Sequence, residues 1–385
     1  MVAHAARADG RKGEKMRFVG GEVLTLGGTL RADEVHVSGG EIATSGGGPV
    51  IDVSGCWVLP GMVDVHGDAF ETALFPRPGV EMDFALAMAA VDRQLLACGI
   101  TTAYHGLSVG WEPGARGIAA ARRFMSGLAD LRGDLSADHR VQLRWDVFAH
   151  DVVDDLRVWL RQEPVPALAF NDHTTETLET VAAGQTGQLE KWARRAGVSL
   201  EAYLADLEML AAPQDAIPEM VQQVAAMARA AGAVMLGHDE ATAEERAAHR
   251  ALGVRVSEFP LSEAVAKAAV EMGEHVVLGA PNAARRQSHK GNLSAWEAVK
   301  GGTCAVLASD YYYPSLLYVV EQLVRDGMAL GDAWALVSGN PATAMGLHDR
   351  GAIVAGKRAD LVVIEPGKRW RIRHVMAGGV LSSFG

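Results

Sequence analysis

The sequence predicts an α/β fold, a (β/α)8 TIM barrel with a small β-sandwich domain built from both chain ends. Apolar strand-like segments alternate with helical ones eight times over roughly 285 residues, which is the size and rhythm of such a barrel. Short strands with glycine turns fill both ends of the 385-residue chain, which indicates one small β domain. Polar side chains follow nearly every barrel strand, and this indicates an enzyme.

Composition favours a globular enzyme over a membrane or nucleic-acid-binding protein. Hydrophobic residues make up 49% of the chain, but no uninterrupted apolar run has transmembrane length. The net charge of -11 argues against non-specific binding to nucleic acid, although an anionic small-molecule substrate remains compatible with local cations. The three cysteines lack paired spacing, so a reducing cytoplasm is expected. A homo-oligomer is left open.

Both chain ends are assigned to the sandwich domain. Residues 1–15 are basic and polar, and we expect a disordered extension or an overlong start before Met16. The domain is expected to comprise residues 16–58 and 346–385. Its predicted strands are residues 16–19, 21–26, 34–37 and 51–53, with further short strands within 350–382.

The barrel is expected to occupy residues 59–345, with its first strand starting slightly earlier. The eight predicted strands are residues 57–65, 100–104, 141–148, 167–170, 233–236, 254–257, 275–278 and 304–308. Residues 174–232 are longer than one helix needs, so we expect a helical insertion, about residues 174–215, after the fourth strand.

A helix is predicted between the first two barrel strands. Asp83 is suited to cap its beginning, and Gly99 to end it. Its apolar face is expected to include Leu86, Val91 and Leu95.

The carboxyl ends of the strands are where such barrels carry their active sites. His66 and Asp68 follow the first strand, and because alternate strand residues point to the same side, they can place an imidazole and a carboxylate on one ion. The other strand ends carry Arg144 and Asp146 (third), Asn171, Asp172 and His173 (fourth), His238, Asp239 and Glu240 (fifth), Glu258 (sixth), Asn282 (seventh), and Ser309, Asp310 and Tyr311 (eighth).

This joint pattern predicts a centre for one or two divalent ions, with zinc favoured over manganese or iron. The predicted metal ligands are His66, Asp68, Asp146, His173, His238 and Asp310. Such an ion lowers the pKa of water toward neutrality. Asp310 is expected to take the proton from that water and pass it to the leaving group. Asp310, His238 and Arg144 form the predicted catalytic set.

Two assignments stay open at this stage. Arg144 and Asp146 share one face of a strand, so they could form a buried ion pair instead of Asp146 binding metal. Of Asp172 and His173, one could bind the ion while the other orients it, and His173 is favoured as the ligand.

Several motifs together resemble the amidohydrolase superfamily. They are Pro60-Gly61-x-x-Asp64-x-His66, the strand-five His238, Ala308-Ser309-Asp310, Asn340-Pro341-Ala342, and the segment 356–361. This resemblance also implies the barrel and the split sandwich. In some superfamily members a carbamylated lysine bridges two ions, and Lys191 is the nearest lysine after the fourth strand, although it lies far beyond it.

Within that superfamily the chain is most similar to the alpha-D-ribose 1-methylphosphonate 5-triphosphate diphosphatase family of the carbon-phosphorus lyase pathway. The similarity rests on His66-Gly67-Asp68 with Glu71, the segment 76–80, Asp172-His173-Thr174, Glu258-Phe259-Pro260, Gly279-Ala280-Pro281-Asn282 and Ser309-Asp310-Tyr311. It implies cleavage of a triphosphate with release of pyrophosphate. The family reads His-Thr-Asp-Asn-Leu-Glu where this chain has residues 66–71 as His-Gly-Asp-Ala-Phe-Glu, so substrate-facing loops differ.

A polyphosphate substrate would need several cations, because a pocket that already holds carboxylates otherwise repels it. The predicted substrate-binding residues are Arg77, Asp239, Glu258, Asn282, Arg285, His289, Lys290 and Tyr311. For residues 285–290 a solvated surface loop is an equal alternative. Two other functions remain open, namely an amide or cyclic-amide hydrolase or deaminase, and a metal-free barrel that serves as a binding or assembly module.

Overall fold

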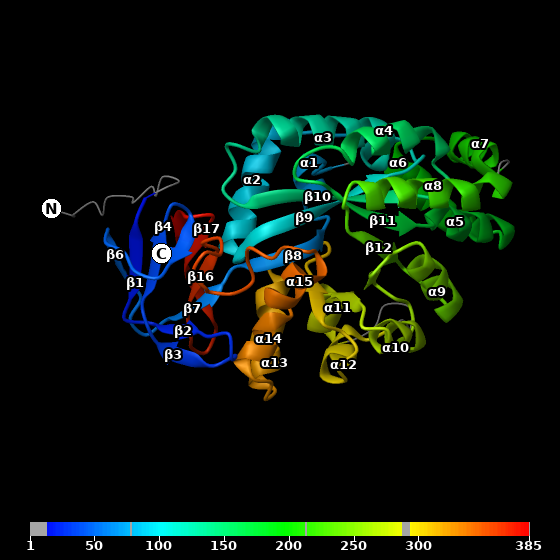
Figure 1. Ribbon diagram of the computed structural model, residues 1–385. Helices are drawn as coiled ribbons and strands as arrows, with labels where there is room; N and C mark the ends of the chain where they lie inside the picture. Colours follow the sequence, from blue (N-terminus) through cyan, green and yellow to red (C-terminus); the bar gives the residue numbers. More distant parts are fainter. Residues whose placement is uncertain (1–13, 78, 212–213, 287–292, 385) are drawn as a thin grey trace.

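The computed structural model describes residues 14–77, 79–211, 214–286 and 293–384, and its centre is a barrel of eight parallel strands (Figure 1). The strands lie in chain order, and a parallel bridge between Gly67 and Asp310 brings the last strand back to the first. The predicted (β/α)8 fold is therefore confirmed. The barrel strands are β8 (Met62–Gly67), β9 (Ile100–Val109), β10 (Asp138–Asp146), β11 (Ala167–Asn171), β12 (Met235–His238), β13 (Val256–Glu258), β14 (His275–Gly279) and β15 (Val306–Ala308).

The first predicted barrel strand, residues 57–65, is two strands, and the single-strand prediction was wrong. β7 (Trp57–Pro60) pairs with β2 (Glu22–Leu24) and β16 (Leu361–Glu365) outside the barrel, whereas β8 pairs with β9. Gly61 separates them at a point where a Cβ would collide with Thr101 and Asp360. The apolar run continues across Gly61 because both strands are buried, so the hydrophobic pattern alone does not show that one strand ends there and another begins.

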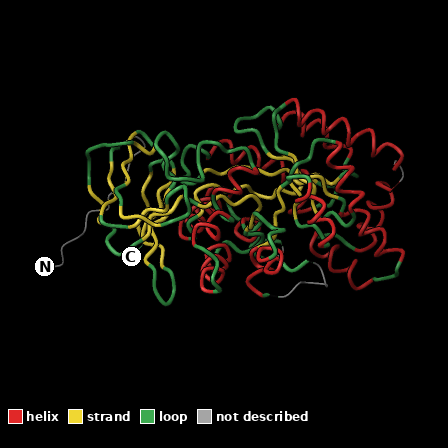
Figure 2. Tube along the Cα trace, turned by 60° about the horizontal axis from the view of Figure 1, so that its bottom comes forward, coloured by secondary structure: helices red, strands yellow, loops and turns green. Residues whose placement is uncertain are grey.

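Two sheets built from both chain ends pack beside the barrel (Figures 1 and 2). Their shared core includes Phe18 and Val37 from the beginning of the chain and Leu361 and Met376 from its end. This packing supports the proposed division into a discontinuous sandwich and a barrel. One sheet has the order β5-β4-β1-β6 and the other β18-β17-β16-β7-β2-β3, with β1 (Met16–Val19), β3 (Leu30–Ala32), β4 (Val35–Ser38), β5 (Glu41–Ala43), β6 (Val50–Asp52), β17 (Arg371–Ala377) and β18 (Val380–Ser383).

The predicted first barrel helix is present as α2 (Phe84–Ala97). The Asp83 side chain accepts a hydrogen bond from the Leu86 N–H at 2.9 Å, and Gly99 follows the helix with φ of 82°. Val91 and Leu95 are buried, but Leu86 is 57% exposed, so its assignment to the apolar face was wrong. Leu86 lies in the first turn, where the side chain points away from the barrel core.

Among the described residues, four α-helices and the short 3-10 helix η3 (Gln214–Ala216) lie between β11 and β12, in the region where the insertion is expected. The α-helices are α5 (His173–Ala182), α6 (Thr186–Ala196), α7 (Leu200–Ala211) and α8 (Ile217–Ala230). Ala193, Ala196 and Tyr203 form a small core between α6 and α7, and Figure 1 shows both helices at the end of the barrel away from the sandwich.

The remaining helices cover the barrel or connect its strands. They are α1 (Phe70–Leu74), α3 (Ile118–Leu131), α4 (Val153–Trp159), α9 (Ala243–Ala251), α10 (Glu263–Glu271), α11 (Ala280–Arg285), α12 (Ala295–Lys300), α13 (Ser315–Arg325), α14 (Leu330–Ala335), α15 (Gly339–Ala344), and the 3-10 helices η1 (Gly114–Arg116), η2 (His150–Val152) and η3 (Gln214–Ala216). Among the residues that the structure describes, no helix combines the length and the apolar character needed to cross a membrane.

Candidate metal centre

The carboxyl ends of the barrel strands bring together three sets of side chains that could hold a metal ion. Within each set, one ligand atom per residue lies within 4.8 Å of the others. In the described part of the chain the sets are His66, His238 and Glu258; His173, His238 and Asp239; and His66, Asp68 and Asp310. Five of the six predicted ligands occur in these sets, and Asp146 does not.

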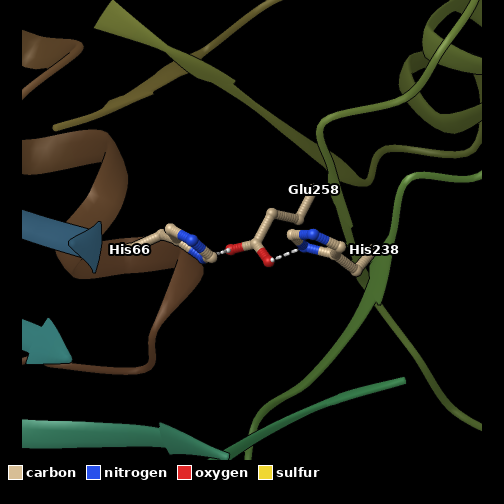
Figure 3. A group of neighbouring side chains, drawn as sticks. All are labelled: His66, His238 and Glu258. Atoms are coloured by element: carbon tan, nitrogen blue, oxygen red, sulfur yellow. Dashed lines mark hydrogen bonds and ion pairs between the residues drawn. The ribbon is translucent and has the colours of Figure 1, made fainter. Parts of the chain in front are cut away.

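Glu258 lies between His66 and His238 and faces Nδ1 of both rings (Figure 3). Its carboxylate oxygens are 3.2 Å from His66 Nδ1 and 2.7 Å from His238 Nδ1, and the rings stack with centroids 5.5 Å apart. Gln142 donates a hydrogen bond of 2.6 Å to the same carboxylate. With both Nδ1 atoms turned to Glu258, the Nε2 atoms point away from it and are the atoms left for a ligand.

The charge on Glu258 is maintained by these contacts. Burial alone raises the pKa of this carboxyl group, but the charges and hydrogen bonds of His66 and His238 lower it below the usual range. Because Glu258 is fully buried, its contacts suit a residue that orients the two imidazoles. The contact with substrate that the sequence indicated for Glu258 stays a prediction.

Asp68 and Asp310 face His66 from the ends of β8 and β15. The Asp310 N–H donates to the His66 carbonyl at 2.9 Å, and the Asp68 N–H donates to the Asp310 carbonyl at 2.9 Å. Burial raises the pKa of Asp310 to about 6. The two carboxylates and the imidazole are thus held on one side of the barrel closure.

Three residues that follow barrel strands adopt the left-handed backbone region. Asp239, Phe259 and Asp310 each have φ of 54° although none is glycine. Their N–H groups bond to the carbonyls of Glu258, Val277 and His66, respectively, which lie on neighbouring strands. Such strained conformations persist only where the surroundings fix them, and they gather at functional sites.

Arg144 lies between His173 and His238. Its Nη2 atom is 3.0 Å from His238 Nε2 and 3.4 Å from His173 Nε2. A guanidinium can only donate, so the His238 Nε2 lone pair accepts, which agrees with the Nδ1 proton pointing to Glu258. Arg144 therefore occupies the lone pair that His238 would otherwise offer to an ion.

Asp146 and Asp172 are engaged elsewhere. Asp146 accepts hydrogen bonds of 3.0 Å from the Thr174 hydroxyl and from the Phe148 N–H, and burial raises its pKa to about 7. The structure shows no ion pair between Asp146 and Arg144 in the residues it describes. Asp172 caps α5 by accepting from the Thr175 N–H, so of the strand-four pair only His173 lies in a candidate metal set. A ligand role for Asp146 stays a prediction.

A pocket of about 250 Å³ opens beside this centre. Its lining includes Arg144, Asp146, His173, Glu112 and Arg116. Arg116 donates to Glu71 at 2.9 Å and lies 3.7 Å from an Asp68 oxygen.

Sequence reasoning missed the residues after β9 because it ended the second strand at Tyr104, whereas β9 continues to Val109. With the correct end, Glu112 and Arg116 would have stood in the loop that follows the strand, where functional residues are expected.

The remaining predicted substrate residues are spread around the barrel mouth. Asn282 accepts from the Ala295 N–H at 3.1 Å and so holds a neighbouring segment. Arg77 lines a second cavity, and Arg285 and Tyr311 line a third. Asp239 lies 3.5 Å from His238 Nε2. His289 and Lys290 lie outside the described residues.

Known proteins resemble this chain in sequence. The model of the amidohydrolase family matches residues 142–381. The alpha-D-ribose 1-methylphosphonate 5-triphosphate diphosphatase of Escherichia coli (strain K12) is 31% identical over 324 residues, covering 81% of this chain and 84% of that protein. Adenine deaminase 2 of Rhizobium meliloti (strain 1021) is 26% identical, covering 99% of this chain and 58% of that protein.

Solved structures share the fold at low sequence identity. A molinate hydrolase has a TM-score of 0.63 with 14% identity, covering 97% of this chain and 95% of its own. A β-aspartyl dipeptidase of Fervidobacterium islandicum AW-1 has a TM-score of 0.61 with 14% identity, covering 96% of each chain.

Proposed function

The chain belongs to the amidohydrolase family, and on that premise we propose that this metal-dependent hydrolase cleaves a phosphoanhydride bond of a phosphorylated sugar and releases pyrophosphate. The observation that carries the proposal is the presence of two guanidinium groups at the centre itself. Arg144 contacts His238, and Arg116 lies beside Asp68. A phosphate chain would be repelled by the carboxylates without such cations, whereas a neutral amide has no need of them. The similarity to the Escherichia coli diphosphatase supports the same substrate class.

The donor set fits one divalent ion, zinc being favoured over manganese or iron. His66, Asp68 and Asp310 would hold it, while Glu258 orients the His66 ring. When bound, the ion supplies Lewis acidity that lowers the pKa of water toward neutrality. One ion is expected because Arg144 takes the place that a second ion would need at His238.

The side chains of this chain then have separate tasks. The Asp310 carboxylate accepts the proton of the attacking water and returns it to the leaving phosphate oxygen. Arg144 and Arg116 donate hydrogen bonds to phosphate oxygens, which become more negative as the anhydride bond breaks. His238 bonds to Glu258 through Nδ1 and to Arg144 through Nε2, and so fixes the position of the Arg144 guanidinium.

A second candidate function keeps the same centre but changes the substrate. Adenine deaminase 2 of Rhizobium meliloti is among the relatives, so hydrolysis or deamination of a C–N bond is the alternative. The three cysteines are free thiols, which is compatible with the expected cytoplasmic location, and a homo-oligomer remains an expectation.

An activity screen of the zinc-loaded protein tests the proposal. We expect pyrophosphate from a ribose 5-triphosphate, and little ammonia or carboxylate from adenine, hydantoins or N-acyl amino acids. The Asp310→Asn variant, purified in the same way, controls for contaminating phosphatases. Turnover of the amides or of adenine without any pyrophosphate from the triphosphate would establish the alternative instead.

A further inference from the structure

A second cavity, which we call the outer cavity, adjoins the pocket of the metal centre. It has a volume of about 830 Å³ and is lined by residues within 71–77, 79–81 and 112–123, by the carboxyl-terminal half of α6 and by Gly197 after it. Glu112, Arg116 and Arg195 line both the outer cavity and the pocket beside the centre. A ligand that reaches past Arg116 from the centre would therefore enter the outer cavity.

The described lining of the outer cavity is rich in cations, although the chain as a whole carries a net charge of -11. Six cationic and three acidic side chains line it. The cations are Arg77, Arg116, Arg123, Lys191, Arg194 and Arg195, and the acids are Glu71, Glu81 and Glu112. The local excess of positive charge favours an anionic ligand.

Each of the three acids already has its own arginine partner. Arg116 donates to Glu71 at 2.9 Å, the Arg123 guanidinium lies 3.3 Å from Glu81, and Arg195 donates to Glu112 at 2.7 Å. Glu112 also accepts a hydrogen bond of 2.6 Å from the Tyr203 hydroxyl.

Three cations remain after these pairs are formed. Within the described residues, Arg77, Lys191 and Arg194 have no carboxylate at ion-pair distance. They come from the segment before α2 and from α6, so they face the cavity from two walls.

The wall that carries Lys191 and Arg194 is held in place. These residues are three apart on α6 and therefore lie on one face of the helix. Gly114, with φ of 86°, packs so closely against the end of α6 that a Cβ would lie 2.8 Å from the Ala196 carbonyl oxygen. The helix dipole favours cations such as Arg194 in the last turn of α6, but it does not account for Lys191 or Arg77.

We propose that the outer cavity binds the distal phosphate groups of the substrate and thereby selects linked phosphates over a monophosphate. The choice of a phosphate ligand rests on the proposed function, whereas the anion site itself rests on the charges of the cavity. Arg116 lies at the junction, where it contacts Asp68 and lines both spaces. Lys191 and Arg194 supply uncompensated positive charge beyond that junction.

Direct binding of pyrophosphate to the full-length zinc-loaded protein, measured by isothermal titration calorimetry, tests this assignment. We expect pyrophosphate to bind more tightly than inorganic phosphate. The double variant Lys191→Glu/Arg194→Glu should weaken pyrophosphate binding by about tenfold or more, because two attractive charges become repulsive. Its zinc content and melting temperature should match those of the wild type, since both side chains are exposed.

The matched control is Arg93→Glu/Arg161→Glu, which reverses two exposed charges outside both cavities. It should change pyrophosphate binding less than about twofold. A neutral variant, Lys191→Gln/Arg194→Gln, should lie between the wild type and the charge reversal, and it replaces the charge reversal if that variant is unstable. Equal weakening in the control, or no weakening in the α6 variants, overturns the assignment.

The outcome is separable from that of the activity screen. If pyrophosphate binding depends on Lys191 and Arg194 but no phosphoanhydride is cleaved, the anion site stands and the proposed reaction fails. If the protein releases pyrophosphate from the triphosphate but the affinity for pyrophosphate is the same in the Lys191 and Arg194 variants as in the wild type, the outer cavity is not the subsite.

Discussion

The metal centre and the outer cavity meet at Arg116, yet they are built in opposite ways. The centre is acidic, and its burial ranges from the buried His66, His238 and Glu258 to the partly exposed aspartates. Its residues come from the ends of β8, β12 and β13 and from the segments after β8, β11, β12 and β15. The outer cavity is cationic and more exposed, and its residues come from loops and from α6. The barrel thus fixes the groups expected to act on water, while segments outside its strands supply the charges expected to choose the substrate. Each half can be tested separately.

The largest expected effect lies at the centre. Asp310→Asn should lower kcat by about 100-fold to 10,000-fold, because the amide cannot accept the proton from the attacking water. Steady-state kinetics on the substrate found in the screen measure this loss. Because Asp310 is also a proposed zinc ligand, the assay must contain enough zinc to restore the wild-type zinc content, and the melting temperature must stay near that of the wild type. A variant that keeps both the zinc and most of the activity would remove Asp310 from the proton transfer.

A smaller effect is expected at Glu258, which contacts both histidines of the centre. Glu258→Gln should weaken zinc binding by about 10-fold to 100-fold, because an amide accepts the Nδ1–H groups of His66 and His238 less well than the carboxylate and no longer fixes the orientation of the two rings. Competition with a chelator of known affinity measures the change. Glu274→Gln is the matched control, since Glu274 is also a buried carboxylate but pairs with Arg246 and Arg250. Equal zinc affinities in both variants would argue against an orienting role for Glu258.

Sequence reasoning located the centre better than the outer cavity for a physical reason. Residues at strand ends are fixed by the barrel, so His66, Glu258 and Asp310 could be placed once the strands were found. Loop residues have no such periodic signal, and Arg116 was missed because β9 continues five residues beyond its predicted end. Arg77 was expected to bind substrate, but its neighbours Lys191 and Arg194 come from an insertion whose packing only the structure shows.

The limits of the fold prediction have the same origin. Most of the eight strands were recognisable because they contain buried apolar residues and end at polar ones, although β10 also carries Arg140, Gln142 and Arg144 along its length. The division at Gly61 was not recognisable, because β7 and β8 are both largely buried and only the close approach of Thr101 marks the crossing. Contacts between distant segments decide such boundaries.

Added salt should weaken pyrophosphate binding in the outer cavity a few-fold more than zinc binding at the centre. Raising the ionic strength from about 0.1 M to about 1 M shortens the Debye length from about 10 Å to about 3 Å. Pyrophosphate binding in the outer cavity should weaken several-fold, since Lys191 and Arg194 are exposed. Zinc binding at the centre should change much less, because His66 is buried and Asp68 and Asp310 are only partly exposed. Calorimetric titrations at both salt concentrations provide the measurement, and parallel losses would mean that the two regions do not differ in exposure to ions.

The smallest expected change is the gain of one zinc ion per chain when Arg144 is replaced. The guanidinium contacts Nε2 of both His238 and His173, so it holds the position that a second zinc ion would need in the set formed with Asp239. Arg144→Gln removes the charge and should raise the zinc content from about one to about two ions per chain, measured by elemental analysis after dialysis against buffered zinc. Arg140→Gln is the control, because Arg140 lies on the same strand but pairs with Asp138. Two tightly bound ions in the wild type, or only one in Arg144→Gln, would show that the guanidinium does not limit the metal count.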